Sequence, residues 1–451
     1  PCIDSRPSHP PRVWSVVLGY EILGFLARVP QVYVGSCAPL GGRFDVVPRV
    51  LHILSQRPSL TGSGVTLDAL VCRAAGDWEQ CAVIGVPAGE PLPAVGDLGA
   101  GRLSAVRFGP DGDLDFPVPG MSDVMPYPST RFSSMSRDQL DRYRAAWRSH
   151  LGAVLASFRP DLIHVNHVWL VAAMLKDLAP DTPVVNHCHA TGLRQRQLCP
   201  HLAEEVAQGC RRNDRFAVIH GGVGQQLRAA LGVGAESIHV VGPGYRDELF
   251  HALGRGCPPG RRLLYIGKYS AAKGLPSLLD AVEALRPSMP DLELHVAGSG
   301  AGDEADGIRR RMEGMAPAVV LHGMLAQAAL AELMRTCHVC VLPSFYEGVP
   351  LVLAEAMACG CRVVATALPG VEGELAPRMG SALRLVPMPR LGGVDTPLVG
   401  DLPAFVGELA TAIDRSLGQG EIDLEGEGVS LGEFTWGAVF ERVEGIWNSL
   451  L

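Results

Sequence analysis

At 451 residues, the chain is too long for one ordinary domain and has the length of two domains of about 200 residues each. Hydrophobic residues make up 47% and charged residues 19%, which excludes a disordered chain, and the formal net charge of −8 argues against a basic, nucleic-acid-binding surface. The 12 cysteines are scattered and no secretory signal is evident, so we expect free thiols and a cytoplasmic location.

The first 45 residues contain Pro-rich polar stretches around an apolar segment, Val13–Val34, and no motif to which we assign a function. The most apolar part, Trp14–Leu26, contains Glu21 and is shorter than the ~20 residues of a membrane-spanning helix. We therefore predict an N-terminal extension of unknown role at 1–45 and no transmembrane span. The protein is expected to be either freely soluble or peripherally attached to a membrane.

The first strand of the fold is predicted at Val50–Leu54, followed by a glycine-bearing turn, Ser59–Leu67, that leads into an apolar helix. A strand, a Gly-rich turn and a helix in this order begin a Rossmann-like half. Gly62 and Gly64 are expected to face the cleft. Most Gly-Ser-Gly sequences are only turns, so it is the place of this one after the first strand that favours contact with a ligand.

A second strand is predicted at Cys81–Gly85, and the stretch after it, Pro87–Thr130, is rich in Gly, Pro and Asp and shows no clear element. Long irregular stretches in compact domains are usually functional or mobile. We therefore expect ligand contacts around Met121–Arg131. Ser136–Gln139 then looks like a capping box, and apolar residues at helical spacing continue to Phe158, which predicts a core helix.

Two strands that end in histidine-rich turns follow, Asp161–Val165 with His167 just after it, and Pro183–Gly192 one helix later. The carboxyl ends of parallel strands carry ligand sites. A zinc site is one interpretation of the four histidines, but strand alternation sends only His187 and His189 the same way, and no acidic ligand is nearby. We expect no metal. The four histidines are His164, His167, His187 and His189.

Phe216–His220 and Ile238–Gly242 are predicted to be the last strands of the first half, and a Gly/Pro-rich linker at 251–261 leads to the second half. The second half begins with another strand, turn and helix, and Lys268 and Lys273 bracket that turn. Lysine ammonium groups placed there can neutralise a phosphate without a metal ion, although two lysines in a polar turn are most often only solvated.

Two patterns in the second half are typical of other functions. Gly298 and Gly300 follow the strand Leu292–Ala297 as in a dinucleotide-binding turn, but Asp303 takes the third glycine position, so we reject a dehydrogenase. Four cysteines have a spacing loosely like that of a zinc ribbon, yet small buried thiols are the simpler account because the cysteines adjoin buried strands. These are Cys337, Cys340, Cys359 and Cys361.

The most informative stretch is Ser344–Glu355, which lies between a strand-like run, Val339–Leu342, and a helix-like run, Leu351–Met357. A buried strand, a Gly/Pro turn and a helix start aim backbone N–H groups and a positive dipole end at an anion. Two carboxylates, Glu347 and Glu355, can accept hydrogen bonds from paired hydroxyls such as those of sugars. Two glutamates at this spacing are usually only solvated, but the glycine turn after a strand favours a ligand site.

Ser344–Gly360 resembles the E-x₇-E signature of the retaining, family-four (group 1) glycosyltransferases, and Ala354–Gly360 continues the match. The resemblance implies an α/β architecture, the GT-B fold, in which two Rossmann-like domains face a central cleft. It also implies an enzyme of carbohydrate biosynthesis that moves a hexosyl or related group from a nucleoside diphosphate sugar to an acceptor hydroxyl, with retention of configuration and without a metal or other cofactor. The alternatives are another GT-B enzyme, such as a sugar-nucleotide epimerase or a phosphorylase, and a non-catalytic sugar-nucleotide-binding protein.

The resemblance also implies roles for single residues. Glu347 would hold the transferred sugar, Glu355 the ribose, and His189 the sugar near its reacting face, while Lys268 and Lys273 would meet the donor phosphates. The other expected donor contacts are Gly64, Gly323, Met324, Gly348, Val349, Pro350 and Leu351. Acceptor contacts are expected around Met121–Arg131, with Arg131, His167 and Arg194 as candidates, although Arg194 could equally face solvent.

The predicted organisation is an acceptor-binding domain at 46–245, a nucleotide-sugar-binding domain at 250–432 and a C-terminal helix at 433–451 that, by resemblance, crosses back onto the first domain. Gly244–Phe250 resembles the interdomain segment of the family, but Pro243 and Arg246 replace its Asn and Asp, which leaves the hinge contacts undetermined. The sequence identifies neither the base nor the sugar. The acceptor is expected to be a sugar, a natural product or a lipid-linked glycan.

Overall fold

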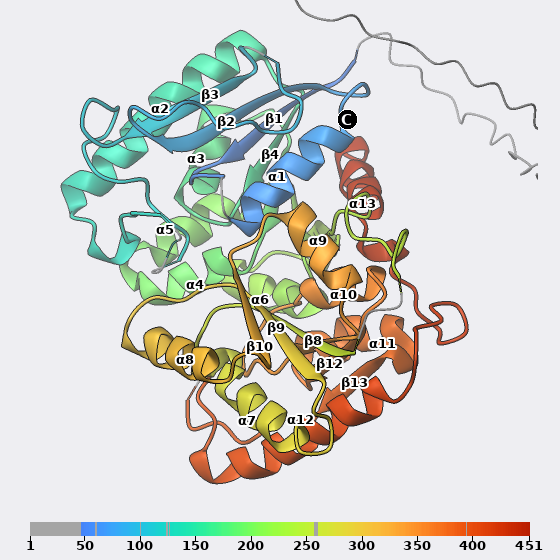
Figure 1. The fold of residues 1–451 in the computed structure, drawn as a ribbon. Coiled ribbons are helices and arrows are strands. Elements are labelled where there is room, and N and C mark those ends of the chain that lie inside the picture. The colour runs from blue at the N-terminus through green and yellow to red at the C-terminus, as the bar shows by residue number, and fades with distance from the viewer. Residues whose placement is uncertain are drawn as a thin grey trace, which may run out of the picture. The chain divides into compact units, whose positions relative to one another are not determined.

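The chain folds into two parallel sheets with helices packed around them, as Figure 1 shows for this computed structural model. The structure describes residues 47–58, 61–99, 101–122, 125, 127–256, 260–393 and 395–451. The predicted extension at 1–45 lies outside the described residues. The two sheets confirm the prediction of an α/β protein with two Rossmann-like halves.

The first half is built on a seven-stranded sheet in the order β3-β2-β1-β4-β5-β6-β7, with every pair parallel. The order reverses beside β1, and in such sheets ligands bind where the order reverses, at the carboxyl ends of the strands. Its strands are β1 (Arg49–Leu54), β2 (Glu79–Pro87), β3 (Leu103–Phe108), β4 (Leu162–Asn166), β5 (Val184–Cys188), β6 (Arg215–Val218) and β7 (Ile238–Val240). Its helices are α1 (Gly62–Arg73), α2 (Arg137–Phe158), α3 (Leu170–Leu178), α4 (Thr191–Leu198), α5 (Pro200–Cys210) and α6 (Gly221–Leu231).

The second half is built on a six-stranded parallel sheet in the order β10-β9-β8-β11-β12-β13, which reverses beside β8 in the same way. Its strands are β8 (Arg261–Ile266), β9 (Leu292–Ala297), β10 (Val319–Gly323), β11 (Val339–Leu342), β12 (Arg362–Thr366) and β13 (Leu383–Val386). Its helices are α7 (Leu275–Leu285), α8 (Asp303–Gly314), α9 (Gln327–Arg335), α10 (Val352–Ala358), α11 (Ala376–Met379) and α12 (Leu402–Leu417).

The central strands are apolar because they are covered on both faces. β11 is fully buried along its length, as is β12, and near-continuous apolar runs are typical of parallel strands between helix layers. β3 was not predicted and lies inside the stretch that showed no clear element. Four of its six residues are only half-buried, because it pairs with β2 alone at the edge of the sheet.

The longest helix among the described residues, α2, begins as its capping-box sequence predicts. The Ser136 hydroxyl accepts a hydrogen bond from the Gln139 backbone N–H at 3.2 Å, and the Ser136 N–H donates to the Gln139 side chain at 2.9 Å. The helix ends at Phe158, with Arg159 in the left-handed region. None of the helices in the described part of the chain is long and apolar enough to cross a membrane.

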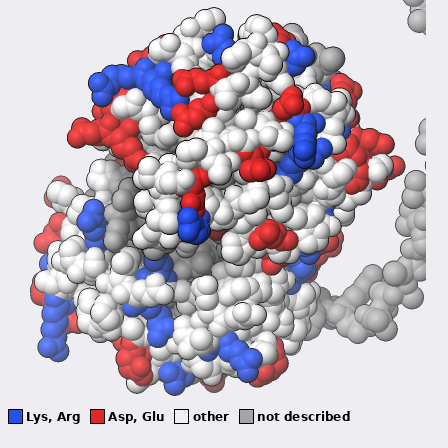
Figure 2. Space-filling model, turned by 90° about the horizontal axis from the view of Figure 1, so that it is seen from below, with Lys and Arg blue, Asp and Glu red and all other residues white. Residues whose placement is uncertain are grey.

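The last helix, α13 (Trp436–Asn448), packs against α1 in the first half, and Figure 1 shows the two side by side. The indole N–H of Trp78 donates to Glu444 at 2.9 Å, and the rings of Trp78 and Trp447 meet edge to face with centroids 4.9 Å apart. These contacts join the end of the chain to the first sheet. On the face shown in Figure 2, acidic and basic side chains are interspersed.

Candidate active site

A cavity of about 520 Å³ is lined by residues of both halves, at the carboxyl ends of the strands of the first sheet. The first half contributes the start of α1 and the ends of β4 and β5, and the second contributes the residues around the start of α10. Its walls include Gln56, Gly62, Ser63, Thr66, Met121, Met125, His167, His187, His189, Thr191, Tyr245, Arg246, Gln327, Leu351, Glu355 and Trp436.

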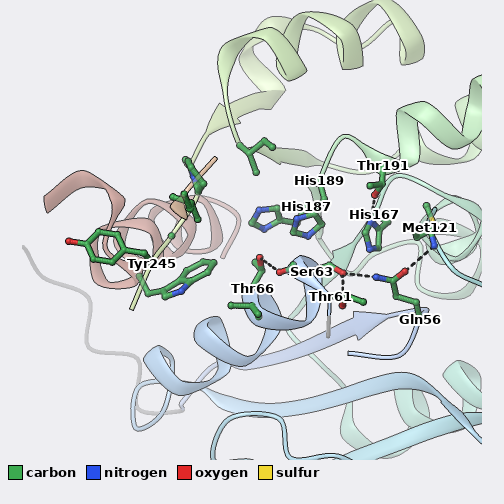
Figure 3. Close-up of a pocket in the computed structure, with 18 of the residues that line it drawn as sticks. Gln56, Thr61, Ser63, Thr66, Met121, His167, His187, His189, Thr191 and Tyr245 are labelled. Carbon is green, nitrogen blue, oxygen red and sulfur yellow. Dashed lines mark hydrogen bonds between the residues drawn. The ribbon is translucent and has the colours of Figure 1, made fainter. Parts of the chain in front are cut away.

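The side chain of Gln56 connects two segments that line the cavity. Its amide N–H donates to the Ser63 hydroxyl at 2.8 Å, and its amide oxygen accepts from the Met121 backbone N–H at 3.0 Å (Figure 3). Gln56 thus ties the start of α1 to the segment in which ligand contacts were expected. Met121, Ser122 and Met125 of that segment line the cavity.

Gly62 and Gly64 begin α1 but face different surroundings. Gly62 lines the cavity, whereas a Cβ at Gly64 would lie 1.8 Å from the carbonyl oxygen of Pro58. Gly64 also donates its N–H to the hydroxyl of Thr61, the N-cap of α1, at 3.1 Å. The absence of a side chain at Gly64 therefore allows the start of α1 to pack on the preceding backbone.

Replacing Gly64 with alanine should destabilise the fold by about 2 kcal/mol or more, because the Pro58 backbone would have to move to admit the methyl group. Gly62→Ala is the matched control, since a Cβ there meets nothing within 4 Å. Urea unfolding of the two variants measures the difference. Equal stability of both would contradict this account of the turn.

His189 is a neutral ring with one free acceptor nitrogen. The Asn166 side-chain N–H donates to the Ile53 carbonyl at 3.2 Å, so its amide oxygen faces His189 and accepts from Nε2–H at 2.9 Å. Burial lowers the pKa of His189 well below its usual value, with neighbouring His187 as a further cause. A neutral ring that donates from Nε2 has a lone pair on Nδ1. His189 can therefore accept a hydrogen bond from a ligand hydroxyl.

His167 lies on the same wall in a strained backbone conformation, with a φ of 72°. Its Nδ1 is 3.1 Å from the Thr191 hydroxyl, and its buried Nε2 has no hydrogen-bond partner among the described residues. Burial lowers the pKa of His167 to about 3, so the ring is neutral at physiological pH. The strained backbone and the unpartnered nitrogen favour a binding role for His167, which was predicted as an acceptor-side residue.

No group of three or more His, Cys, Asp or Glu side chains that could hold a metal ion occurs in the described part of the chain. His187 and His189 point to the same side of β5, as alternation predicted, and their rings stack with centroids 4.5 Å apart. The four cysteines considered for zinc are buried, and burial raises the pKa of Cys337 and of Cys359 to about 11. These thiols are therefore protonated at neutral pH.

The first glutamate of the signature is held by two donors. Glu347 Oε1 accepts from the Ser344 hydroxyl at 2.9 Å and forms an ion pair with Lys273 Nζ at 2.7 Å. Lys273 also donates to the Tyr346 carbonyl at 3.3 Å. Lys273 is close to the signature because Gly274, with a φ of +67°, lets the turn before α7 approach Pro343, whose carbonyl oxygen would lie 2.0 Å from a Cβ.

The second glutamate, Glu355, lines the cavity. Its carboxylate has no hydrogen-bond partner among the described residues, and burial raises its pKa from 4.5 to about 7. An unpaired carboxylate in a half-buried position is costly unless a ligand supplies donors. Leu351 at the start of the same helix also lines the cavity.

Two family models match the chain: Glycosyl transferases group 1 over residues 260–387 and Glycosyltransferase Family 4 over residues 109–249. The chain belongs to the group 1 glycosyltransferase family. The two matched regions fall in the second and first halves respectively, so both halves of the fold carry the relationship.

Curated relatives agree with this assignment. Glycogen synthase of Mycobacterium tuberculosis (strain H37Rv) is 29% identical over 228 residues, which cover 48% of this chain and 54% of that protein. The phosphatidyl-myo-inositol mannosyltransferase of Mycolicibacterium smegmatis is 35% identical over 145 residues, 32% of this chain and 36% of that protein. The chain thus spans about half or less of the length of these curated relatives.

A structure of Anabaena HepE in complex with UDP and glucose has a TM-score of 0.53 to this chain at 18% identity, and the match covers 88% of this chain and 99% of that one. At that identity the likeness concerns the fold, which is the two-domain GT-B architecture of glycosyltransferases. The predicted family and fold class are confirmed.

Not all of the residues that the resemblance selected for this group 1 glycosyltransferase line the cavity. His167, His189, Leu351 and Glu355 do. Glu347 and Lys273 are paired outside it. Lys268, Met324 and Gly348 are exposed at the turns of the second half, and Arg131 and Arg194 are exposed in the first. Gly64, Gly323, Val349 and Pro350 are not among the lining residues.

The structure adds the segment between the two halves, Tyr245 and Arg246, to the candidate site. Tyr245 donates its N–H to the Phe434 carbonyl at 2.7 Å and accepts from the Trp436 N–H at 3.1 Å, and both Tyr245 and Trp436 line the cavity. Arg246, which replaces the Asp of the family's segment, pairs with Asp68 of α1. No local sequence pattern indicated these contacts, because each joins segments far apart in the chain.

Proposed function

We propose that the chain transfers a glycosyl group from a nucleoside diphosphate sugar to an acceptor hydroxyl, with retention of configuration and without a metal ion. The observation that carries this proposal is Glu355, an unpaired carboxylate in the cavity between two Rossmann-like halves. A ribose supplies two neighbouring hydroxyl donors, and an ionised carboxylate can accept hydrogen bonds from both. The solved complexes of Anabaena HepE with UDP and with UDP-glucose favour a nucleotide donor of this class.

The donor would extend from Glu355 toward Glu347 along the signature turn. Lys273 lies at the Glu347 end of that path, 2.7 Å from Glu347, and the exposed Lys268 precedes Lys273 in the turn after β8. As the anomeric bond breaks, negative charge grows on the diphosphate and positive charge on the sugar, so ammonium groups and backbone N–H groups here stabilise the leaving group. The positive charges of Lys268 and Lys273 support a reaction that proceeds without a metal ion.

In the proposed step, the acceptor oxygen forms a bond to the anomeric carbon on the face from which the diphosphate leaves. The acceptor's proton passes to an oxygen of the departing phosphate, so the charges balance. His189 contributes the lone pair of Nδ1 to a hydroxyl of the transferred sugar, and Glu347 accepts from other hydroxyls. His167, with its unpartnered Nε2, would contact the acceptor.

Calorimetric titration with UDP, GDP, ADP and dTDP tests the donor site, and we expect one of the four to bind selectively. The matching nucleotide sugar, incubated with simple sugar and polyol acceptors, should then yield a product whose anomeric proton has the donor's configuration by NMR. EDTA should leave the rate unchanged. Failure of all four nucleotides to bind a folded protein would contradict the proposal, and turnover of donor without any acceptor would favour an epimerase.

A further inference from the structure

A line of polar side chains crosses one face of the first sheet, where the surroundings are otherwise apolar. Gln80 on β2, His52 on β1, His164 on β4 and His187 on β5 are all buried, with His164 completely inaccessible. Buried polar groups without partners are costly, and the hydrogen bonds of His164 and His187 have a definite order, although the buried Nδ1 of His52 has no partner among the described residues. The series of hydrogen bonds ends at the cavity, because His187 is one of the residues that line the cavity.

The direction of these hydrogen bonds is fixed by the C-terminal helix. The Trp447 indole N–H, which can only donate, lies 3.0 Å from Nδ1 of His164, so that nitrogen is the acceptor. Neutral His164 then carries its hydrogen on Nε2, which lies 3.3 Å from Nδ1 of His187. His187 in turn accepts on Nδ1 and must carry its own hydrogen on Nε2. We call this series of hydrogen bonds, from Trp447 through His164 to His187, the Trp447 relay.

The neutrality that the relay requires agrees with the surroundings of both rings. Burial lowers the pKa of His164 well below its usual value, and burial lowers the pKa of His187 to about 4. Among the described residues, the aromatic groups that face the two rings are other imidazoles and the indole of Trp447, none of which carries a charge at neutral pH. Each ring therefore holds one hydrogen, and the assignment of tautomers is determined.

The relay leaves one N–H donor without a partner. No hydrogen bond from Nε2 of His187 is present among the described residues, although the ring lines the cavity. Its neighbour His189 stacks on it with an interplanar angle of 3°, and the bond from His189 Nε2–H to Asn166 leaves its Nδ1 as an acceptor. Figure 3 shows the two rings together on one wall. His187 and His189 thus offer the cavity one N–H donor and one acceptor nitrogen. Sugar hydroxyls can bond to both, because a hydroxyl both accepts and donates.

We propose that His187 donates a hydrogen bond from Nε2–H to a hydroxyl oxygen of the sugar carried by the nucleotide, and that Trp447 and His164 are positioning residues that fix the tautomer required for it. The sugar contact rests on the proposed function, whereas the tautomer does not. The C-terminal helix would in this way set the hydrogen-bonding character of a residue 260 positions earlier in the chain (447 against 187).

A purely structural role for the same residues predicts different measurements. Trp447 is completely buried and contacts Trp78 and Phe440, so it would stabilise α13 without any influence on His187. Trp78 provides the matched control, because its indole also donates to a side chain of the same region, Glu444 of α13, and its ring also packs on that helix. Trp78→Phe removes an indole hydrogen bond from this interface and leaves the relay intact.

The first measurement is made on the wild-type protein without ligand. Two-bond ¹H–¹⁵N spectra of a deuterated sample with ¹⁵N-labelled histidine give the tautomer of each ring, with His164→Gln and His187→Gln used to assign the two signals. We expect both rings in the Nε2–H form at pH 7.5. An Nδ1–H tautomer or a charged ring for His187 would overturn the relay whether or not any sugar nucleotide binds.

The second measurement compares variants in the same spectra. Trp447→Phe removes the indole donor, so His164 can turn its hydrogen to Nδ1 and a population of Nδ1–H His187 should appear, while Trp78→Phe should keep the wild-type tautomer. If Trp447→Phe does not fold, the wild-type spectrum alone decides the relay. An unchanged His187 tautomer in folded Trp447→Phe would remove Trp447 from the proposal.

The sugar contact is tested by the ratio of affinities for UDP-glucose and UDP, and for GDP-mannose and GDP, measured by calorimetry. His187→Leu should reduce this ratio about five- to tenfold for the donor that binds, whereas His187→Gln, which retains an N–H donor near the place of Nε2, should keep most of it. Equal ratios in wild type and His187→Leu would overturn the contact. Absence of binding by UDP, GDP, ADP and dTDP would overturn it together with the proposed function, and the tautomer would still decide the relay.

Discussion

Replacing Lys273 with alanine should lower the rate of glycosyl transfer about 10²–10³-fold, with a smaller change in donor affinity. The expected loss is that of one preorganised charge at a leaving group, which acts mainly in the transition state. Lys273 is a half-buried cation held 2.7 Å from Glu347 by the turn before α7. Initial rates at saturating donor separate kcat from KM and measure the effect.

The chain offers unusual controls for this experiment because it contains only three lysines, Lys176, Lys268 and Lys273. Lys176 pairs with Asp214 at 2.7 Å and donates to the Thr182 carbonyl at 2.9 Å, outside the cavity, so Lys176→Ala should change stability rather than transfer. Lys268→Ala should add to the effect of Lys273→Ala. Transfer at the wild-type rate in the Lys268 and Lys273 double-alanine variant would remove both lysines from the reaction.

The sequence predicted those parts of the fold that depend on local patterns. The apolar runs at β1, β4, β5 and β11 were all recognised, because strands buried between helix layers consist mostly of apolar residues. β3 was missed because its half-buried residues lie in a Gly- and Pro-rich stretch and pair only at a sheet edge. Edge strands have weaker patterns because only one neighbour constrains them.

The candidate site was predictable only where one segment contains the chemistry. Glu347 and Glu355 stand in one strand–turn–helix motif, so their roles could be inferred from spacing and resemblance. The Trp447 relay joins residues 283 positions apart at its first hydrogen bond, and nothing in the neighbourhood of His164 indicates an indole. His187 was considered only for a metal, because its tautomer depends on that distant donor.

The interdomain segment, Gly244–Phe250, is a second case in which contacts between distant segments could not be predicted from the sequence. The replacement of Asp by Arg246 was visible in the sequence, but its partner was not, since Asp68 lies on α1, 178 residues earlier. Asp68 also accepts from the Gly96 backbone N–H at 2.7 Å. The structure therefore explains the departure from the family pattern as an ion pair between the hinge and the first half.

Glu355→Gln should weaken nucleotide-sugar binding about tenfold at pH 8 and have little effect at pH 5.5. The pKa of Glu355 is raised to about 7 by burial, so the carboxylate that accepts the ribose hydroxyls is largely protonated at the lower pH. Hydrogen bonds to a charged acceptor contribute about 1.5–3 kcal/mol, and that contribution disappears as pH falls through 7. Glutamine is neutral throughout, so the ratio of the two affinities isolates this group from the titration of the ligand.

The pH dependence of the free energy of unfolding reports the same pKa of Glu355 without any ligand. Between pH 4.5 and pH 7 the folded chain keeps a proton on Glu355 that the unfolded chain has released, so the stability of the wild type falls as pH rises through that window. Glu355→Gln removes this loss and should be more stable than the wild type by up to about 3 kcal/mol at pH 8, with no difference near pH 4.5. Urea unfolding at the two pH values measures this. A wild type as stable as the variant at pH 8 would mean that the carboxylate already has a donor within the chain, and the ribose would then have to displace it.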